Sequence, residues 1–164
     1  RLEWLALVLA GDVPDGLGAG ETLERIRTAG GVPVLCWAPG KWWFKRGRAV
    51  RRLLADYEAG DFLLGDTTLR PGLWLTPFLM RRARRMGHRL LAGSDPLPIA
   101  GEERVMGSYG CAMRCAFDES RPADSLRNAL LHGGGIRFMG RRGGALHVLR
   151  RLAANQAARK KAQR

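Results

Sequence analysis

Four short apolar runs recur along the first part of the chain, and a glycine-containing polar segment follows each of them. The runs lie at residues 4–10, 32–38, 62–64 and 89–92, so their starts are about 27 to 30 residues apart. A short continuous apolar run is typical of a strand that is buried on both faces. The spacing leaves room for a loop and a crossover helix in each unit. We therefore expect successive strand–helix units.

The segments between the runs show helical periodicity. In residues 49–57, apolar side chains recur every three or four positions and charged side chains lie between them. Another helix is expected to begin at Thr76, as the N-cap, and Pro77, as the first helical residue. Its arginines are most simply interpreted as a solvent-exposed face. Weaker patterns predict helices at residues 20–29 and after Pro122.

Alternating buried strands and one-sided helices indicate an α/β protein with a parallel sheet. The pattern fits a complete or partial TIM-like barrel, and an open sheet remains an alternative. The rhythm changes after residue 95, where residues 109–117 are a candidate fifth strand and residues 133–144 are rich in glycine. Because the chain begins at Arg1 without an initiator methionine and enters a strand almost at once, we expect that an upstream portion is missing.

Residues 137–164 form a basic end. They contain nine Lys and Arg and no Asp or Glu, and so account for +9 of the formal net charge of +13. Within them, residues 145–162 predict a helix that docks through a stripe including Leu146, Leu149 and Leu152. Such an end can bind nucleic acid or an anionic membrane surface. No aromatic stacking platform accompanies it, so a solubilising end is the preferred interpretation.

Several classes of protein are disfavoured. No run of about 18 apolar residues occurs, so we expect no membrane span and a cytoplasmic location. Cys111 and Cys115 lack the second pair that would complete a zinc cage, and we expect reduced, buried thiols. The three histidines do not follow the strands as a group. Motifs of zinc proteases, serine hydrolases and nucleotide-binding loops are absent.

Two aspartates follow apolar runs at equivalent points of the repeat. Asp66 follows Gly65, and Asp95 follows Gly93 and Ser94. Ligands of α/β proteins collect at the carboxyl ends of the strands. Two carboxylates on one rim can hold a divalent cation or share acid and base catalysis, so both are candidate catalytic residues. Alternatively, both residues cap helices or form Asx turns.

Aromatic and cationic residues share the same loops. Lysine beside tryptophan suits an anionic or ring-bearing ligand, such as a phosphate ester or a sugar. Alternatively, the tryptophans pack the loop down, and the arginines pair with Glu102 or Glu103. The candidate residues for binding a small anionic substrate are Trp37, Lys41, Trp42, Thr67, Arg70, Ser94 and Arg104.

Two segments resemble the polymerase and histidinol phosphatase (PHP) superfamily of barrel phosphoesterases. AGGVPVLCWAPG, residues 29–40, is similar to that family's Ala-Gly-Gly followed by a strand that ends in His-Pro, and LLAGSDPL, residues 90–97, is similar to its Gly-Ser-Asp followed by Ala-His. The resemblance covers about residues 29–108 and corresponds to the second half of a typical member, so it implies that residues 1–136 are the C-terminal part of a larger barrel. It implies a TIM-like barrel that binds zinc, manganese or iron, with Asp95 as a metal ligand. The chain departs from the family by having Trp37 in place of a metal-binding histidine and Pro96 after Asp95.

The sequence thus leaves three hypotheses. The first is a PHP-like metal-dependent hydrolase, or a diverged member, that acts on a phosphorylated or anionic small molecule with Asp66 and Asp95 as catalytic residues. The second is a non-catalytic ligand-binding or scaffold barrel that has lost its metal site, because the family's histidines are missing. The third is nucleic-acid binding through the basic end.

Overall fold

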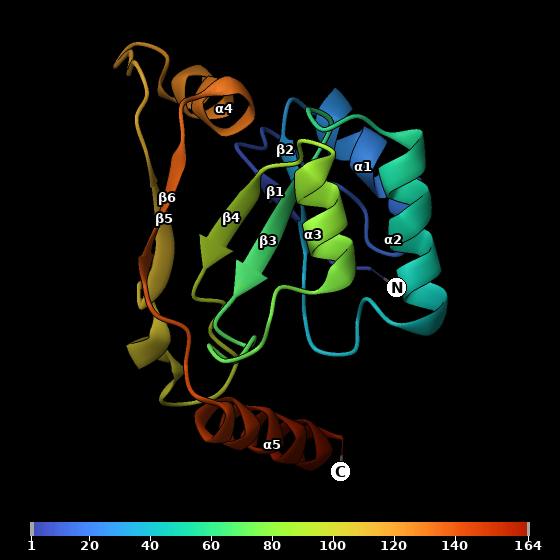
Figure 1. Ribbon diagram of the computed structural model, residues 1–164, viewed down its shortest axis with the longest axis vertical. Helices are drawn as coiled ribbons and strands as arrows, with labels where there is room; N and C mark the ends of the chain where they lie inside the picture. Colours follow the sequence, from blue (N-terminus) through green and yellow to red (C-terminus); the bar gives the residue numbers. More distant parts are fainter. Residues whose placement is uncertain (1, 164) are drawn as a thin grey trace.

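A four-stranded sheet forms the centre of the protein, which we describe from a computed structural model covering residues 2–163 (Figure 1). Its strands lie in the order β1 (Trp4–Leu7), β2 (Val32–Cys36), β3 (Leu63–Thr67) and β4 (Leu90–Gly93). The strands β2, β3 and β4 are parallel, as the repeat predicted, whereas β1 pairs with β2 in the antiparallel sense. An apolar run carries no information about strand direction, so the expectation of parallel strands was wrong for β1.

Helices cover the first face of the sheet. They are α1 (Ala19–Thr28), α2 (Phe44–Asp56) and α3 (Phe78–Arg85), which stand together on one side in Figure 1. Leu64 of β3 packs on this side with Leu53 of α2 and Met80 of α3, and all three side chains are almost completely buried. The three- and four-residue periodicity therefore identified the helical faces that meet the sheet.

A smaller layer covers the other face. It consists of α4 (Pro122–His132) and the antiparallel pair β5 (Tyr109–Met113) and β6 (Ile136–Gly140). Leu63 packs here with Leu130 of α4. The predicted fifth strand is present but ends earlier, and β6 was not predicted because its residues are mostly exposed and lie in the glycine-rich segment.

The sheet of residues 2–163 is open. It ends at β1 on one side and at β4 on the other, and β5 and β6 form a separate two-stranded sheet. A barrel requires each strand to pair on both sides around a closed ring. Here α4, β5 and β6 cover the face that would line the interior of a barrel. The chain is thus an α/β protein with strand–helix units, a mixed sheet and a strand pair, and the described residues form no closed barrel.

The last helix, α5 (Ala145–Ala162), crosses the end of the sheet toward which β3 and β4 point (Figure 1). Its buried side chains are Val148, Arg151 and Asn155, whereas Leu146 and Leu149 are 71% and 61% exposed. The expected leucine stripe was therefore wrong. Within residues 2–163, no helix is long and apolar enough to cross a membrane.

Replacing Leu64 with alanine tests the central packing. Leu64 is completely buried between the sheet and the helices, so Leu64→Ala should lower the free energy of unfolding by about 2–5 kcal/mol. Leu75→Ala is the matched control because Leu75 is 85% exposed, and it should change stability by less than about 0.5 kcal/mol. Chemical denaturation measures both. Equal losses in the two variants would contradict this packing.

Candidate functional site

The carboxyl ends of three parallel strands meet at one edge of the sheet. In the register, Cys36 lies opposite Gly65, and Thr67 lies opposite Gly93. The side chain of Thr68 donates a hydrogen bond to the carbonyl of Ser94, which ties the ends of β3 and β4 together. The loops that the sequence singled out therefore start from this common edge.

Asp66 is buried within this edge and is fully bonded. Arg70 donates from Nε to Oδ1 at 2.7 Å, and Tyr109 donates its hydroxyl to Oδ2 at 3.1 Å. The backbone nitrogen of Thr67 also donates to Oδ1, and only 1% of Asp66 is exposed. Burial and the nearby Asp66 carboxylate raise the pKa of Tyr109 to about 12. These contacts give Asp66 a structural function, and its catalytic function stays a prediction.

Arg70 extends this arrangement outward. Besides pairing with Asp66, it donates from Nη1 to the carbonyl oxygen of Trp74 at 3.0 Å. Arg70 is itself only 4% exposed. Because a buried ion pair is stable only when its remaining donors are satisfied, this contact fixes the loop of residues 71–77 in place.

Asp95 differs from Asp66 because its side chain is free. Within residues 2–163 its carboxylate makes no hydrogen bond or ion pair, and the residue is exposed. Although the residue as a whole is exposed, its carboxyl group is partly shielded from water by neighbouring atoms, and this loss of hydration, together with the negative charge of Glu3, raises the pKa of Asp95. Its backbone is left-handed, with φ at 48°, which is uncommon for a residue other than glycine. Asp95 is thus the available carboxylate at this edge.

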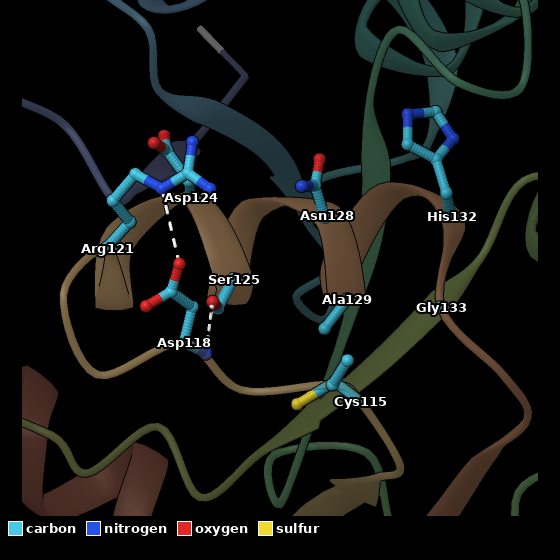
Figure 2. Close-up of a pocket in the computed structure, with 10 residues that line it drawn as sticks. Cys115, Asp118, Arg121, Asp124, Ser125, Asn128, Ala129, His132 and Gly133 are labelled. Atoms are coloured by element: carbon cyan, nitrogen blue, oxygen red, sulfur yellow. Dashed lines mark hydrogen bonds and ion pairs between the residues drawn. The ribbon is translucent and has the colours of Figure 1, made fainter.

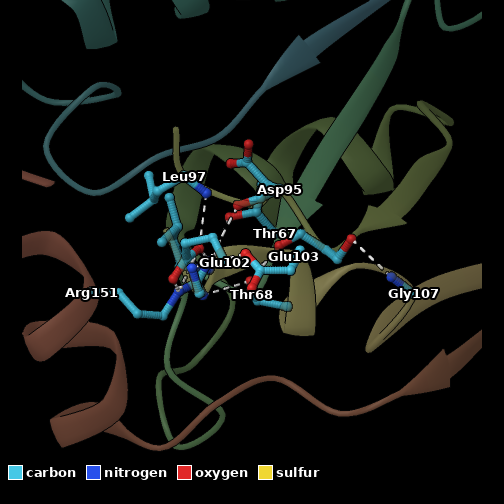
Figure 3. Close-up of polar contacts among 11 residues, drawn as sticks. Thr67, Thr68, Asp95, Leu97, Glu102, Glu103, Gly107 and Arg151 are labelled. Atoms are coloured by element: carbon cyan, nitrogen blue, oxygen red, sulfur yellow. Dashed lines mark hydrogen bonds and ion pairs between the residues drawn. The ribbon is translucent and has the colours of Figure 1, made fainter. Parts of the chain in front are cut away.

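A second buried ion pair joins α5 to the edge (Figure 3). Arg151 donates from Nε to Oε1 of Glu102 at 2.8 Å and from Nη2 to Oε2 at 2.6 Å. Its Nη1 donates to the hydroxyl of Thr68 at 2.8 Å, and the backbone nitrogen of Leu97 donates to Glu102. The hydrogen bonds from Arg151 lower the pKa of Glu102. Glu102 belongs to the short 3-10 helix η1 (Glu102–Val105), so three segments meet at this pair.

Basic side chains line a hollow of about 420 Å³ beside this ion pair. Arg104, Arg141 and His147 contribute to its wall, together with Ser108. Glu102 is the acidic residue of the wall, and its charge is already balanced by Arg151. Within the described chain, the side chains of Arg104 and Arg141 have no acidic partner. Guanidinium groups arranged in this way suit a phosphate or carboxylate group.

The other predicted binding residues hold the edge together. Trp42 is 4% exposed and donates its indole nitrogen to the carbonyl of Cys36 at 3.1 Å, and Trp37 is 3% exposed. Lys41 pairs with Glu3. The tryptophans therefore pack the loop down, which was the alternative interpretation of the sequence.

Two hydroxyl residues at the edge also accept backbone hydrogen bonds. The hydroxyl of Thr67 accepts from the backbone nitrogen of Leu69, and that of Ser94 accepts from Gly107 at 3.3 Å. Of the predicted substrate-binding residues, Arg104 lines the basic hollow. Substrate binding by Thr67 and Ser94 stays a prediction.

The donor groups do not fit a multidentate metal site. Among residues 2–163, no three His, Cys, Asp or Glu side chains are placed to bind one metal ion. The oxygens of Asp66 and Glu102 accept hydrogen bonds from arginine. Burial and the charge of Glu3 raise the pKa of Cys36 to about 12, so its thiol stays protonated. Metal binding by Asp95 stays a prediction, and we derive no metal-dependent step.

Another hollow of about 420 Å³ runs along α4 from Arg121 to Gly133 (Figure 2). Asp118 accepts hydrogen bonds from Ser120 and pairs with Arg121 at 3.3 Å, and the hydrogen bonds from Ser120 lower the pKa of Asp118. The hydroxyl of Ser125 accepts from the backbone nitrogen of Asp118. These contacts stabilise the start of α4. Figure 1 places α4 at the end of the sheet away from α5, so this hollow is separate from the carboxyl edge.

Sequence reasoning missed Arg141, His147 and Arg151. The sequence predicts a solvated basic end, and Arg141 and His147 are exposed, whereas the burial of Arg151 was not predicted because arginine side chains are mostly exposed. One signal was available: Val148, Arg151 and Asn155 are spaced as one helical face. A comparison with protein-family models, curated proteins and solved structures finds no significant match to this chain.

Replacing Glu102 with glutamine tests the anchor of α5. The variant leaves Arg151 buried without a counter-charge and should lower the free energy of unfolding by about 3–5 kcal/mol. Glu24→Gln is the control because Glu24 forms an exposed pair with Arg27, and it should change stability little.

The pH dependence of stability checks the same pair. The pKa of Glu102 is lower in the folded chain than its ordinary value of 4.5. The stabilisation is therefore complete above about pH 4.5 and is lost as the pH falls through the folded pKa. Thermal unfolding across this pH range should show that the stability of the parent chain falls more steeply with decreasing pH than the stability of Glu102→Gln. Parallel curves would contradict the assignment.

Proposed function

We propose that the protein binds an anionic, phosphorylated small molecule in the hollow lined by Arg104, Arg141 and His147. The observation that carries this proposal is the absence of acidic partners for both arginines within the described chain. The hollow lies beside the carboxyl edge, where α/β proteins bind their ligands. What distinguishes this hollow, of about 420 Å³, is that Arg104, Arg141 and His147 share its wall and its acidic residue, Glu102, is paired with Arg151.

Several groups can share the recognition of the anion. The two guanidinium groups can each donate two hydrogen bonds to a phosphate. The hydroxyl of Ser108 is exposed and lies in the same wall. Arg151 adds little net charge because it is paired with Glu102, and its contribution is to hold α5 against the hollow.

The proposal extends to catalysis, in which the protein hydrolyses the phosphate ester that it binds. Asp95 supports it because its carboxylate is free, and because a raised pKa brings a carboxyl group closer to the range that suits proton transfer. Arg151 donates to the carbonyl of Asp95 at 3.3 Å, which places the backbone of Asp95 near the hollow. The proposed activity uses Asp95 as an acid or base toward a phosphate ester. Membership of the PHP superfamily and a partial barrel stay predictions, as does nucleic-acid binding through the basic end.

Titration with pyrophosphate, inorganic phosphate and glucose 6-phosphate tests the binding. Arg104→Ala and Arg141→Ala should each weaken the affinity for the bound anion about 10- to 100-fold, because each variant removes charge-assisted hydrogen bonds. Arg150→Ala is the matched control, because Arg150 is exposed on α5 and does not line the hollow. Isothermal titration calorimetry measures all three variants. Failure of all three anions to bind, or an equal loss in the control, would contradict the proposal.

Asp95→Asn separates catalysis from binding. The substitution removes the titrating group from an exposed position, so hydrolysis of p-nitrophenyl phosphate should fall by about 100-fold or more while anion affinity changes little. Release of nitrophenolate measures the turnover. If the parent chain releases none, the protein is a binding module without hydrolase activity. Unchanged turnover in the variant would remove Asp95 from the mechanism.

A further inference from the structure

Large apolar side chains gather on the surface at the starts of α2 and α3. Phe44 and Leu75 are 85% exposed, Leu73 is 71% exposed and Phe78 is 64% exposed. We call this set, completed by Trp43 and Trp74, the apolar end surface. Single exposed apolar residues are ordinary on protein surfaces, but a contiguous group marks a binding surface.

The members of the apolar end surface lie together. Trp43, Phe44 and Phe78 line one hollow, which Trp37 also borders. The ring of Trp37 packs edge to face on Trp74, with 6.5 Å between the ring centroids. The start of α2 and the loop of residues 71–77 therefore form one surface.

Buried contacts hold this loop outward. Arg70, paired with Asp66, donates to the carbonyl of Trp74 at 3.0 Å. The backbone nitrogen of Gly72 donates to the carbonyl of Gly143 at 3.0 Å, just before α5. A buried ion pair thus holds in place a loop whose leucines are exposed to water.

Positive charge lies beside the apolar end surface and continues along α2 and α3 toward their far ends. Every basic residue of α2 and α3 is exposed, and within residues 2–163 none of them forms an ion pair. These residues are Lys45, Arg46, Arg48, Arg51, Arg52, Arg81, Arg82, Arg84 and Arg85. Arg48 and Arg51 line the same hollow as Phe44, and the acidic residue of these two helices is Asp56 at the far end of α2.

We infer that the apolar end surface docks on a bilayer that contains anionic phospholipids. Leucine, phenylalanine and tryptophan side chains enter the headgroup boundary, and neighbouring arginines attract anionic headgroups. A nucleic acid fits less well because its bases would stack on exposed rings such as Phe44 and would leave Leu73 and Leu75 in water, whereas a bilayer covers leucines and rings alike. A second copy of the chain fits less well because a two-fold contact would bring Arg48 and Arg51, which line the hollow of this surface, close to cations of the other copy.

Vesicle co-sedimentation of the full chain tests the inference. The protein should bind vesicles of phosphatidylcholine mixed with phosphatidylglycerol. Its affinity for vesicles of phosphatidylcholine alone should be lower by about tenfold or more. The double variant Phe44→Ser with Leu75→Ser should lose about tenfold or more of the binding, because it removes the two most exposed apolar side chains. Arg48→Glu with Arg51→Glu should remove the preference for the anionic lipid.

Phe117→Ser is the matched control. Phe117 is 62% exposed and lies between β5 and α4, a segment that Figure 1 places at the end of the molecule away from α5. It should leave vesicle binding unchanged. All substituted side chains are exposed, and circular dichroism checks that each variant keeps its fold.

Three results would overturn the inference. The first is absent vesicle binding, or equal binding to both kinds of vesicle. The second is that the parent chain binds a single-stranded oligonucleotide, and that the double variant loses this binding while its vesicle binding is unchanged. The third is a dimer, seen by sedimentation equilibrium, that the double variant dissociates while vesicle binding is absent. None of the six residues of the apolar end surface lines the basic hollow, so this test is independent of anion binding.

Discussion

The arrangement of the carboxyl edge of the sheet depends on the buried ion pair between Glu102 and Arg151. It fixes α5 across the ends of the parallel strands, and Thr68 at the end of β3 completes the contact. It also neutralises the one acidic side chain in the wall of the hollow. Arg104 and Arg141, which have no acidic partner in the described chain, then give the wall a net positive charge.

The second buried ion pair, Asp66 with Arg70, holds another loop in place at the same edge. It commits the more buried of the two predicted catalytic aspartates to the fold and positions the loop of the apolar end surface. The edge therefore separates two kinds of group. Buried carboxylates are bound to arginine and support the loops, whereas Asp95 and the unpaired arginines face outward. This separation favours recognition of an anion over a carboxylate-rich metal centre.

The sequence predicted the parts of the fold that depend on local periodicity. The strands β2, β3 and β4 and the helices packed on them follow from apolar runs such as that around Leu64. The direction of β1 and the pairing of β6 depend on partners far along the chain, which a local pattern does not encode. Arg104 was predicted from its position after β4. Arg151 was not, because a buried arginine is recognisable only once its partner Glu102 is known.

The central claim, an anion site formed by the segments around Arg104, Arg141 and His147, is tested most directly by nuclear magnetic resonance. Backbone amide shifts would be followed during a titration with pyrophosphate. The account predicts saturable shifts concentrated in η1 and in residues 141–147, with little change around the hollow at α4. Shifts centred on residues 115–133, or none at any ratio of pyrophosphate to protein, would contradict it.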